Sequence, residues 1–226
     1  IIFGIACVFS GVAFIPFSSG RLATGFLSTN YLPMVSLYGL LIVGEVLLWN
    51  NLGFDRKAAQ LYFAAPVPFG TVLRAKNAVA GLVIFATTLV VSIVGTVLGT
   101  NVTPSTAVSS ISLTLVLTLY FLSFGNITSV LMPHPIDPTQ ALKKQKSSKS
   151  ALWLVVSLVV LVVPAGLAFG AKWAFNSDGF FFGVLAVDAL IGVVLYKIAT
   201  ESAIERAYRD REKILEELSK GSDPMG

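Results

Sequence analysis

The sequence predicts an all-α integral membrane protein, built as a bundle of six transmembrane helices. Three observations predict this class. First, the chain of 226 residues is 55% hydrophobic and only 12% charged, whereas soluble domains carry about 25% charged residues. Second, its mean hydropathy is +0.81. Third, six apolar runs are long enough to cross a bilayer as helices, and basic residues gather in every second connector between them.

The six predicted spans form one transmembrane domain over residues 1–198, followed by a charged tail at 199–226. Runs such as "LWLVVSLVVLVV" do not alternate in polarity, which favours helices over the strands of a membrane barrel. Pro164 predicts a kink because proline lacks a backbone donor. Ile1 already lies in an apolar run, so we expect a fragment with sequence missing upstream. The spans are expected at 1–18, 31–49, 77–98, 110–131, 151–171 and 179–198.

Lysine and arginine fall mainly on one side of this predicted bundle. The connectors at 19–30, 99–109 and 172–178 carry only Arg21 and Lys172. The positive-inside rule therefore places the other connectors and both termini on the cytoplasmic side of a cell membrane that the chain crosses several times. Lys197 lies at the rim of the last span. The basic residues on the cytoplasmic side are Arg56, Lys57, Arg74, Lys76, Lys143, Lys144, Lys146, Lys149, Arg206, Arg209, Arg211, Lys213 and Lys220.

Tryptophans and glycines support the predicted spans. Trp49, Trp153 and Trp173 fall at span ends, where an amphipathic ring prefers the headgroup level. Two pairs of glycines four residues apart are candidates for close helix contacts, although such pairs are common in any glycine-rich membrane chain. The pairs are Gly95 with Gly99 and Gly166 with Gly170.

A charged segment between the second and third spans predicts a short amphipathic helix, from Arg56 to about Ala64. Asp55 can cap the N-terminus of this helix. Pro66 and Pro68 would end it, because neither can continue a helix. Four apolar residues share the spacing of one helix face. They are Ala58, Leu61, Tyr62 and Ala65.

Two interpretations of this helix are open from the residues alone. It could be a plain interfacial helix that anchors a loop. It could also transmit force, which the length of the connector and the stiffness of two prolines favour. The choice depends on what the loop contacts.

The stretch "NNLGFDRKAAQLYFAAPVPFGTVLRAKN" at 50–77 resembles the cytoplasmic loop of ABC-2 type transporter permeases. A second stretch, "FGNITSVLMPHPIDP" at 124–138, resembles a Gly-Asn, Ser, Pro pattern at the end of a later span in long bacterial members. The resemblance with motifs therefore covers about 50–138, and the rest matches in span count and order. The matching residues of the first stretch are Asn51, Gly53, Asp55, Pro66, Pro68 and Lys76.

The resemblance implies the permease subunit of an ATP-driven exporter. It implies that the segment 50–76 holds a coupling helix, which docks on a separate nucleotide-binding ATPase subunit. ATP and Mg would be held by that partner, so no cofactor is expected on this chain. A second permease half or a second copy would complete the transporter. The implied coupling residues are Asn51, Gly53, Asp55, Arg56, Lys57, Gln60, Pro66, Pro68 and Lys76.

Two acidic residues lie in or near the predicted spans, and one of them leaves an alternative function open. Asp188 lies midway along the sixth span, and Glu45 lies near the cytoplasmic end of the second. A charge at the bilayer centre costs about 2.5–3.5 kcal/mol, so such a residue usually faces protein or water. Asp188 could serve a proton- or ion-coupled secondary transporter, or it could hold one helix to another. For Glu45 we expect a structural or coupling role.

Other function classes find little support in the sequence. No GxxxxGK[ST] motif occurs, so ATP hydrolysis is not expected on this chain. No cluster of acid, base or metal-binding residues indicates an enzyme. The basic stretch "QALKKQKSSKS" lacks interleaved aromatic residues, which argues against nucleic-acid binding and favours contact with anionic lipids. We expect the tail to extend the sixth span as a charged helix that touches the ATPase.

Overall fold

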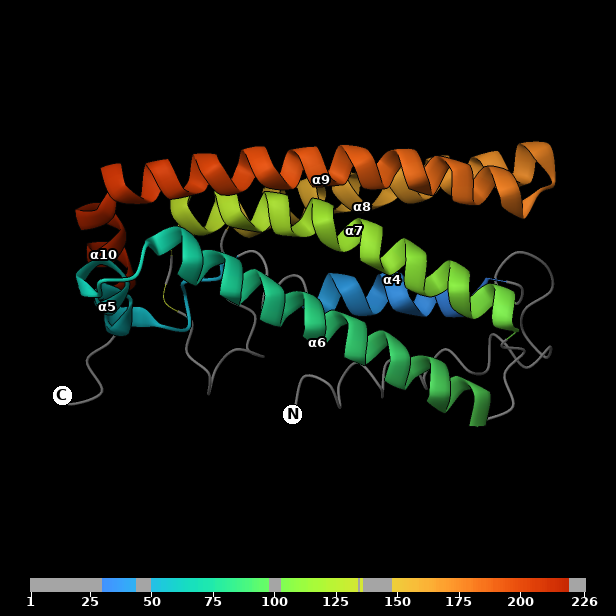
Figure 1. Ribbon diagram of the computed structural model, residues 1–226, viewed down its shortest axis with the longest axis horizontal. Coiled ribbons are helices and arrows are strands. Elements are labelled where there is room, and N and C mark those ends of the chain that lie inside the picture. The colour runs from blue at the N-terminus through green and yellow to red at the C-terminus, as the bar shows by residue number, and fades with distance from the viewer. Residues whose placement is uncertain (1–29, 44–49, 98–102, 134, 136–147, 220–226) are drawn as a thin grey trace.

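The computed structural model describes residues 30–43, 50–97, 103–133, 135 and 148–219. Across these residues the protein is helical and contains no strand. Figure 1 shows long helices running side by side, with two short helices, α5 (Leu61–Ala64) and α10 (Arg211–Ser219), gathered at one end. We call this the loop end, because residues 50–68 form it together with α10.

Among the described residues, four helices contain stretches that are long and apolar enough to cross a membrane. This finding fits a multi-pass membrane protein and agrees with the third to sixth predicted spans. The second predicted span is described only as α4 (Tyr31–Val43). The first predicted span, residues 44–49 and Glu45 lie outside the described residues. The four long helices are α6 (Phe69–Val97), α7 (Pro104–Leu131), α8 (Ser148–Phe175) and α9 (Asp178–Arg209).

The long helices extend beyond the apolar runs that predicted them. α6 begins at Phe69, so Arg74 and Lys76 lie on the helix and not in the connector. α7 begins at Pro104, where Thr103 forms a capping box with Thr106. Such a box satisfies backbone donors that the first turn leaves open. Apolar runs mark the hydrocarbon thickness, whereas the helices continue past it into the polar boundary.

α7 is the central helix of the bundle. It contacts α4, α6, α8 and α9, and its side chains Leu113, Leu117 and Phe121 are fully buried. α9 approaches α7 closely at Gly192, where a Cβ atom would lie 3.2 Å from atoms of both Leu119 and Tyr120. The absence of a side chain at this position therefore sets the distance between the two helices.

The glycine pair Gly166 and Gly170, a candidate for close helix contact, makes no such contact within the described part of the chain. A Cβ atom on either residue would meet nothing within 4 Å. The pair Gly95 and Gly99 lies outside the residues whose side chains are described. The glycine spacing alone does not reveal which helix face is covered, because the motif is equally common on faces that meet lipid.

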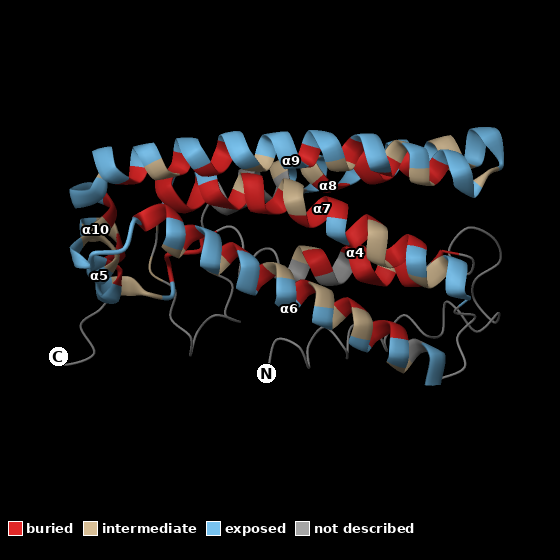
Figure 2. Cartoon of the chain, in the orientation of Figure 1, coloured by how far each residue is buried: buried red, intermediate tan, exposed pale blue. Residues whose placement is uncertain are grey.

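The outer faces of α6, α8 and α9 are apolar and exposed (Figure 2). A soluble domain rarely shows apolar patches of this extent, whereas a membrane helix presents them to lipid. Trp173, 85% exposed in the last turn of α8, fits the predicted headgroup level. The exposed apolar residues include Val79, Leu82, Ile93, Val159, Leu167, Val187, Leu190 and Val194.

α8 and α9 form a helical hairpin whose turn lies at the end opposite to the loop end (Figure 1). Ser177 caps α9 by accepting from the N–H group of Gly179 at 3.2 Å. Lys172 and Asp178 form an ion pair at 2.7 Å across the turn. α8 continues through Pro164 as one helix, so the missing donor does not end it.

The predicted helical extension of the sixth span into the charged tail is present, but only as far as Arg209. α9 ends at Arg209, and Asp210 accepts from Arg206 at 3.1 Å. α10 then turns back to pack on the loop. Its Ile214 and Leu218 are buried against that loop. The tail is therefore part of the folded loop end.

Candidate functional site

Residues 50–68, which we call the loop, combine turns with two short helices. Turns at 50–55 lead into the 3-10 helix η2 (Arg56–Gln60) and then into α5. Ala65 is extended, as expected before Pro66. α6 starts directly after Pro68. The predicted short helix at 56–64 is therefore present, but its first half has the tighter 3-10 geometry.

The predicted helix differs from the structure in two details. Asp55 is the N-cap residue as predicted, but its side chain makes no capping hydrogen bond. The predicted apolar face is also misplaced, since Leu61 is 66% exposed whereas Ala59 is 1% exposed. A 3-10 helix has three residues per turn, so the face rotates away from the position that a 3.6-residue period predicts. Packing against α10 then selects Ala59 for burial.

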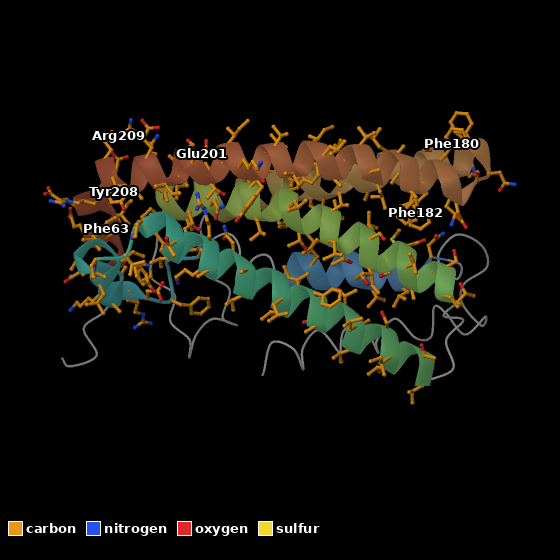
Figure 3. The ribbon with its side chains drawn as sticks, viewed as in Figure 1. Phe63, Phe180, Phe182, Glu201, Tyr208 and Arg209 are labelled. Carbon is orange, nitrogen blue, oxygen red and sulfur yellow. The ribbon has the colours of Figure 1, made fainter. Side chains whose placement is uncertain are left out.

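An apolar cluster joins the underside of the loop to α9 and α10. The rings of Phe63 and Phe69 stack with centroids 5.2 Å apart, and the Tyr208 ring meets both edge-on at 6.3 Å. Figure 3 shows Phe63 and Tyr208 together at the loop end. Aromatic pairs of this geometry add about 0.5–1.5 kcal/mol beyond their burial. The buried members of the cluster are Leu52, Ala59, Phe69, Leu73, Val130, Ala203, Ala207, Ile214 and Leu218.

Asn51 anchors the start of the loop through three of its groups. Its backbone N–H donates to Ser129 Oγ on α7 at 2.8 Å. Its side-chain Nδ2 donates to Asn77 Oδ1 on α6 at 3.0 Å. Its carbonyl oxygen accepts from Lys76 Nζ at 2.9 Å. One residue thus connects the loop to two long helices, and Asn51 is only 8% exposed.

Asp55 and Lys76 form an ion pair across the loop, which is only partly exposed. The ammonium group of Lys76 also lies 5.4 Å from the centroid of the Tyr62 ring. Burial, together with the hydrogen bond and negative charge of Asp55, raises the pKa of Tyr62 to about 12. The Tyr62 phenol therefore stays protonated at physiological pH, and the three side chains clamp the 3-10 helix to α6.

A second layer of polar contacts connects α6 and α7 to α9. Asn77 Nδ2 donates to the Tyr196 hydroxyl at 3.2 Å, and Asn126 Nδ2 donates to Thr200 Oγ1 at 2.9 Å. Thr200 in turn donates to the carbonyl oxygen of Tyr196 at 2.6 Å. Asn77, Asn126 and Thr200 are all buried. In apolar surroundings such bonds rigidify the structure, because breaking one leaves a buried polar group unpaired.

Sequence reasoning missed Asn77, Tyr196 and Thr200 as members of this network. Each is a polar residue inside or beside a long apolar run, and that isolation is the signal that could have found them. Asn126 and Ser129 lie in the stretch that resembles the later-span pattern, although neither was selected as a site residue. The structure brings these residues together with Asn51 at the loop end.

The predicted coupling residues divide into an inner and an outer set. Asn51, Gly53, Asp55 and Lys76 face the bundle and hold the loop. Lys57, Gln60, Pro66 and Pro68 are exposed. Arg56 adopts a left-handed backbone with φ +47° at the start of the 3-10 helix. The sequence did not separate the two sets, because both belong to one continuous motif.

The outer surface of the loop is partly apolar and partly basic. Leu61 is 66% exposed, Val67 45% and Phe54 37%. Lys57 and Gln60 are exposed beside them on η2. Apolar side chains that project from a charged loop, outside the long helices, are typical of a surface that binds another protein.

Asp188 is buried at 5% exposure on the face of α9 that packs on α7. The Tyr120 hydroxyl donates to the backbone carbonyl of Asp188 at 3.1 Å. Among the described residues, Asp188 Oδ2 has no hydrogen-bond partner. The carboxyl group thus lies inside a membrane-spanning helix, one turn from the close approach at Gly192.

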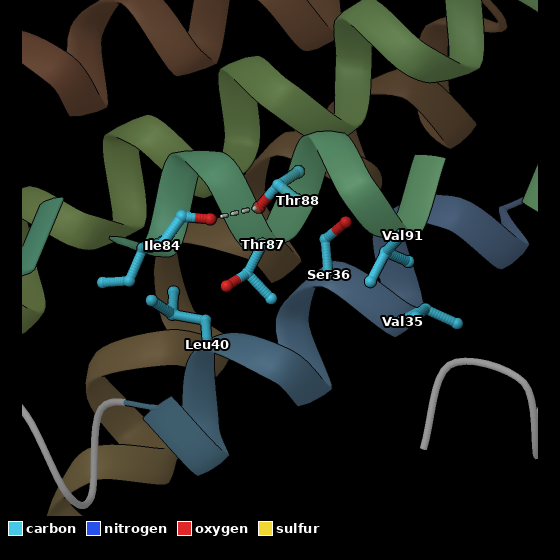
Figure 4. Close-up of a pocket in the computed structure, with 7 residues that line it drawn as sticks. All are labelled: Val35, Ser36, Leu40, Ile84, Thr87, Thr88 and Val91. Carbon is cyan, nitrogen blue, oxygen red and sulfur yellow. Dashed lines mark hydrogen bonds between the residues drawn. The ribbon is translucent and has the colours of Figure 1, made fainter. Parts of the chain in front are cut away.

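A narrow pocket lies between α4 and α6 (Figure 4). Its volume of about 10 Å³ has room for about one water molecule. The Thr88 hydroxyl donates to the carbonyl oxygen of Ile84 at 3.0 Å, and Ser36 shares a hydrogen bond with Ser110 at 2.6 Å. The pocket therefore cannot hold a substrate in this conformation. It is lined by Val35, Ser36, Leu40, Ile84, Thr87, Thr88 and Val91.

No family model, curated protein or solved structure matches this chain. Within the part of the chain that the structure describes, no group of three or more His, Cys, Asp or Glu side chains could hold a metal ion. The functional assignment therefore rests on the loop end and on Asp188.

Proposed function

We propose that this chain is the membrane-embedded permease subunit of an ATP-driven exporter, whose loop docks on a separate ATPase subunit. One observation carries the proposal. The loop is exposed on its outer side, where Leu61 and Val67 project, and on its inner side it is hydrogen bonded to α6 and α7. α6 is in turn bonded to α9, and the apolar underside of the loop packs on α10.

The proposal also places the loop end in the cytoplasm, because ATP is available there. The distribution of lysine and arginine supports this orientation. ATP-driven closure of the ATPase would press on the outer side of the loop, around Gln60. The inner contacts would pass that displacement to the long helices, and a second permease half or a second copy would form the other wall of the pathway.

Photo-crosslinking tests the docking directly. A benzoylphenylalanine introduced for Gln60 should crosslink, in native membranes, to an ATPase subunit that carries a phosphate-binding loop. The matched control replaces Trp173, which is also exposed but lies in the last turn of α8, at the end opposite to the loop end. Absence of an ATPase adduct at Gln60, or equal adducts at both sites, would contradict the proposal.

Asp188 favours a second candidate function, a proton-coupled secondary transporter. A buried carboxyl oxygen without a partner, inside a membrane-spanning helix, is a feature of proton relays. Such a transporter would work without an ATPase. In liposomes that contain only this chain and the pH dye pyranine, an imposed pH gradient should then dissipate, and Asp188→Asn should abolish the effect. The permease proposal expects no dissipation by either protein.

A further inference from the structure

α9 is hydrogen bonded to α6 at two residues that adjoin the two ends of the loop. At the start, Asn77 accepts from Asn51 through Oδ1 and donates to the Tyr196 hydroxyl of α9 through Nδ2. At the end, the Tyr208 hydroxyl of α9 accepts from the backbone N–H of Phe69 at 3.0 Å. Two tyrosine hydroxyls of α9 therefore hold the α6 residues beside the two edges of the loop: Asn77, which bonds Asn51, and Phe69, which follows Pro68.

The middle of the loop is joined to the same unit. α10 follows α9 after the bend at Asp210 and packs on η2. Ile214 and Leu218 are at most 1% exposed there. The start, middle and end of the loop are thus all connected to α9 and its continuation, although at least 119 residues separate each tyrosine from its partner in the sequence.

The contacts of α9 are noncovalent, whereas the link between the loop and α6 is covalent. α6 continues the chain directly from Pro68, so it must follow any displacement of the loop. α9 has no covalent link to the loop and can follow only through noncovalent contacts. Because Asn77 is 2% exposed, breaking its bond to Tyr196 would leave a buried donor unpaired, which makes the connection stiff.

We infer that Tyr196 and Tyr208 are positioning residues that make α9 move with the loop. The partner that displaces the loop would therefore displace α9, the helix that carries Asp188. The inference rests on the proposed function for the source of the force. The mechanical connection between α9 and the loop does not depend on the proposed function, because it is a property of this chain alone.

Hydrogen exchange on the full chain in lipid nanodiscs tests the connection. Tyr196→Phe should raise exchange in peptides that cover 50–60, and Tyr208→Phe should raise it in peptides that cover 61–72. The expected increase is roughly two- to tenfold, the effect of losing one hydrogen bond. Tyr120→Phe is the matched control, because its hydroxyl also bonds α9 but to the carbonyl of Asp188. It should leave the loop unchanged.

Two results would overturn the inference. The first is unchanged loop exchange in both variants. The second is an equal increase in hydrogen exchange over all helices, because a merely structural role of the two tyrosines produces that pattern. Should Tyr196→Phe fail to accumulate, Tyr208→Phe decides the question alone, since Tyr208 is 50% exposed and its replacement is mild.

A distance measurement provides a readout of joint motion. Spin labels at Gln60→Cys and Glu201→Cys, in a Cys7→Ser background, should give a narrow distance distribution between the loop and α9. The double variant Tyr196→Phe, Tyr208→Phe should broaden it, whereas Tyr120→Phe should not. If the distances do not change as expected, the test of the proposed function by the Gln60 crosslink is unaffected. If the crosslink to an ATPase fails while the distance distribution stays narrow, the proposed function is wrong but the connection between the loop and α9 stands.

Discussion

Asn51 illustrates how one buried amide organises the loop end. Its side chain bonds Asn77, while its backbone bonds Ser129 and Lys76. A side chain that cannot hydrogen bond would keep the two backbone contacts and lose only the amide pair. Asn77 Oδ1 would then lose the donor that Asn51 supplies in a buried site.

We therefore predict that Asn51→Leu lowers the free energy of unfolding by about 1–3 kcal/mol, the usual cost of an unpaired buried polar group. Thermal unfolding of the detergent-solubilised protein measures this. Gln60→Leu makes the same chemical change at an exposed position and should change stability by less than about 0.5 kcal/mol. Equal effects at the two positions would refute the buried role of Asn51.

Gly192 sets the spacing of α7 and α9. We predict that Gly192→Leu destabilises the protein by about 1–3 kcal/mol, as overpacking of a tight contact does. Gly183→Leu is the matched control on the same helix, because a Cβ atom there meets nothing within 4 Å. Thermal unfolding should separate the two variants. A destabilisation by Gly183→Leu as large as that by Gly192→Leu would contradict the close approach.

The sequence predicted some of the residues that hold the loop end together, and it missed others. Asn51, Asp55 and Lys76 belong to one local motif, and the structure brings them into contact. Tyr196 joins the network from a helix far along the chain, through a geometry that no local spacing encodes. Asp55 lies at the predicted N-cap position, but its carboxylate pairs with Lys76 and does not cap the helix, because an aspartate at this place suits either role.

At the scale of elements, the loop and α10 form one folded unit. η2 has few contacts of its own, since a 3-10 helix of five residues is short and weakly bonded. Its burial comes from Ile214 and Leu218 of α10. The loop should therefore lose its shape when α10 is displaced, while the long helices remain folded.

Limited trypsin digestion tests this dependence. We predict that Leu218→Asp speeds cleavage after Lys57 by at least about tenfold, because a carboxylate cannot be buried against η2 without a large cost. Burial of a leucine side chain contributes about 1.5–3 kcal/mol to stability. The loss of this contribution in Leu218→Asp accounts for the expected size of the increase in cleavage rate. Glu212→Gln changes an exposed residue of the same helix and should leave the rate unchanged. An unchanged rate in Leu218→Asp would show that α10 does not hold the loop.

Helix ends and helix faces were the least predictable features of the elements. Hydropathy located the cores of α6 to α9, since lipid requires continuous apolar runs. It could not locate their ends, because Arg74 and Lys76 continue α6 outside the apolar run. The buried face of η2 depended on the 3-10 period and on α10, and both arise from tertiary packing.

At the scale of the whole molecule, composition and hydropathy predicted a helical membrane protein, and four long apolar helices agree with it. The six-span count remains a prediction, because residues 1–29 and 44–49 lie outside the described part of the chain. The orientation likewise depends on the charge distribution. The account as a whole requires that the loop and the ATP pool lie on the same side of the membrane.

Cysteine labelling tests that requirement most directly. In a Cys7→Ser background, Gln60→Cys marks the loop end and Ser105→Cys, near Asp178, marks the opposite end. A membrane-impermeant maleimide should label Ser105→Cys in intact cells and Gln60→Cys only in inside-out vesicles. Labelling of Gln60→Cys from outside intact cells would contradict the account, because no cytoplasmic ATPase could then reach the loop.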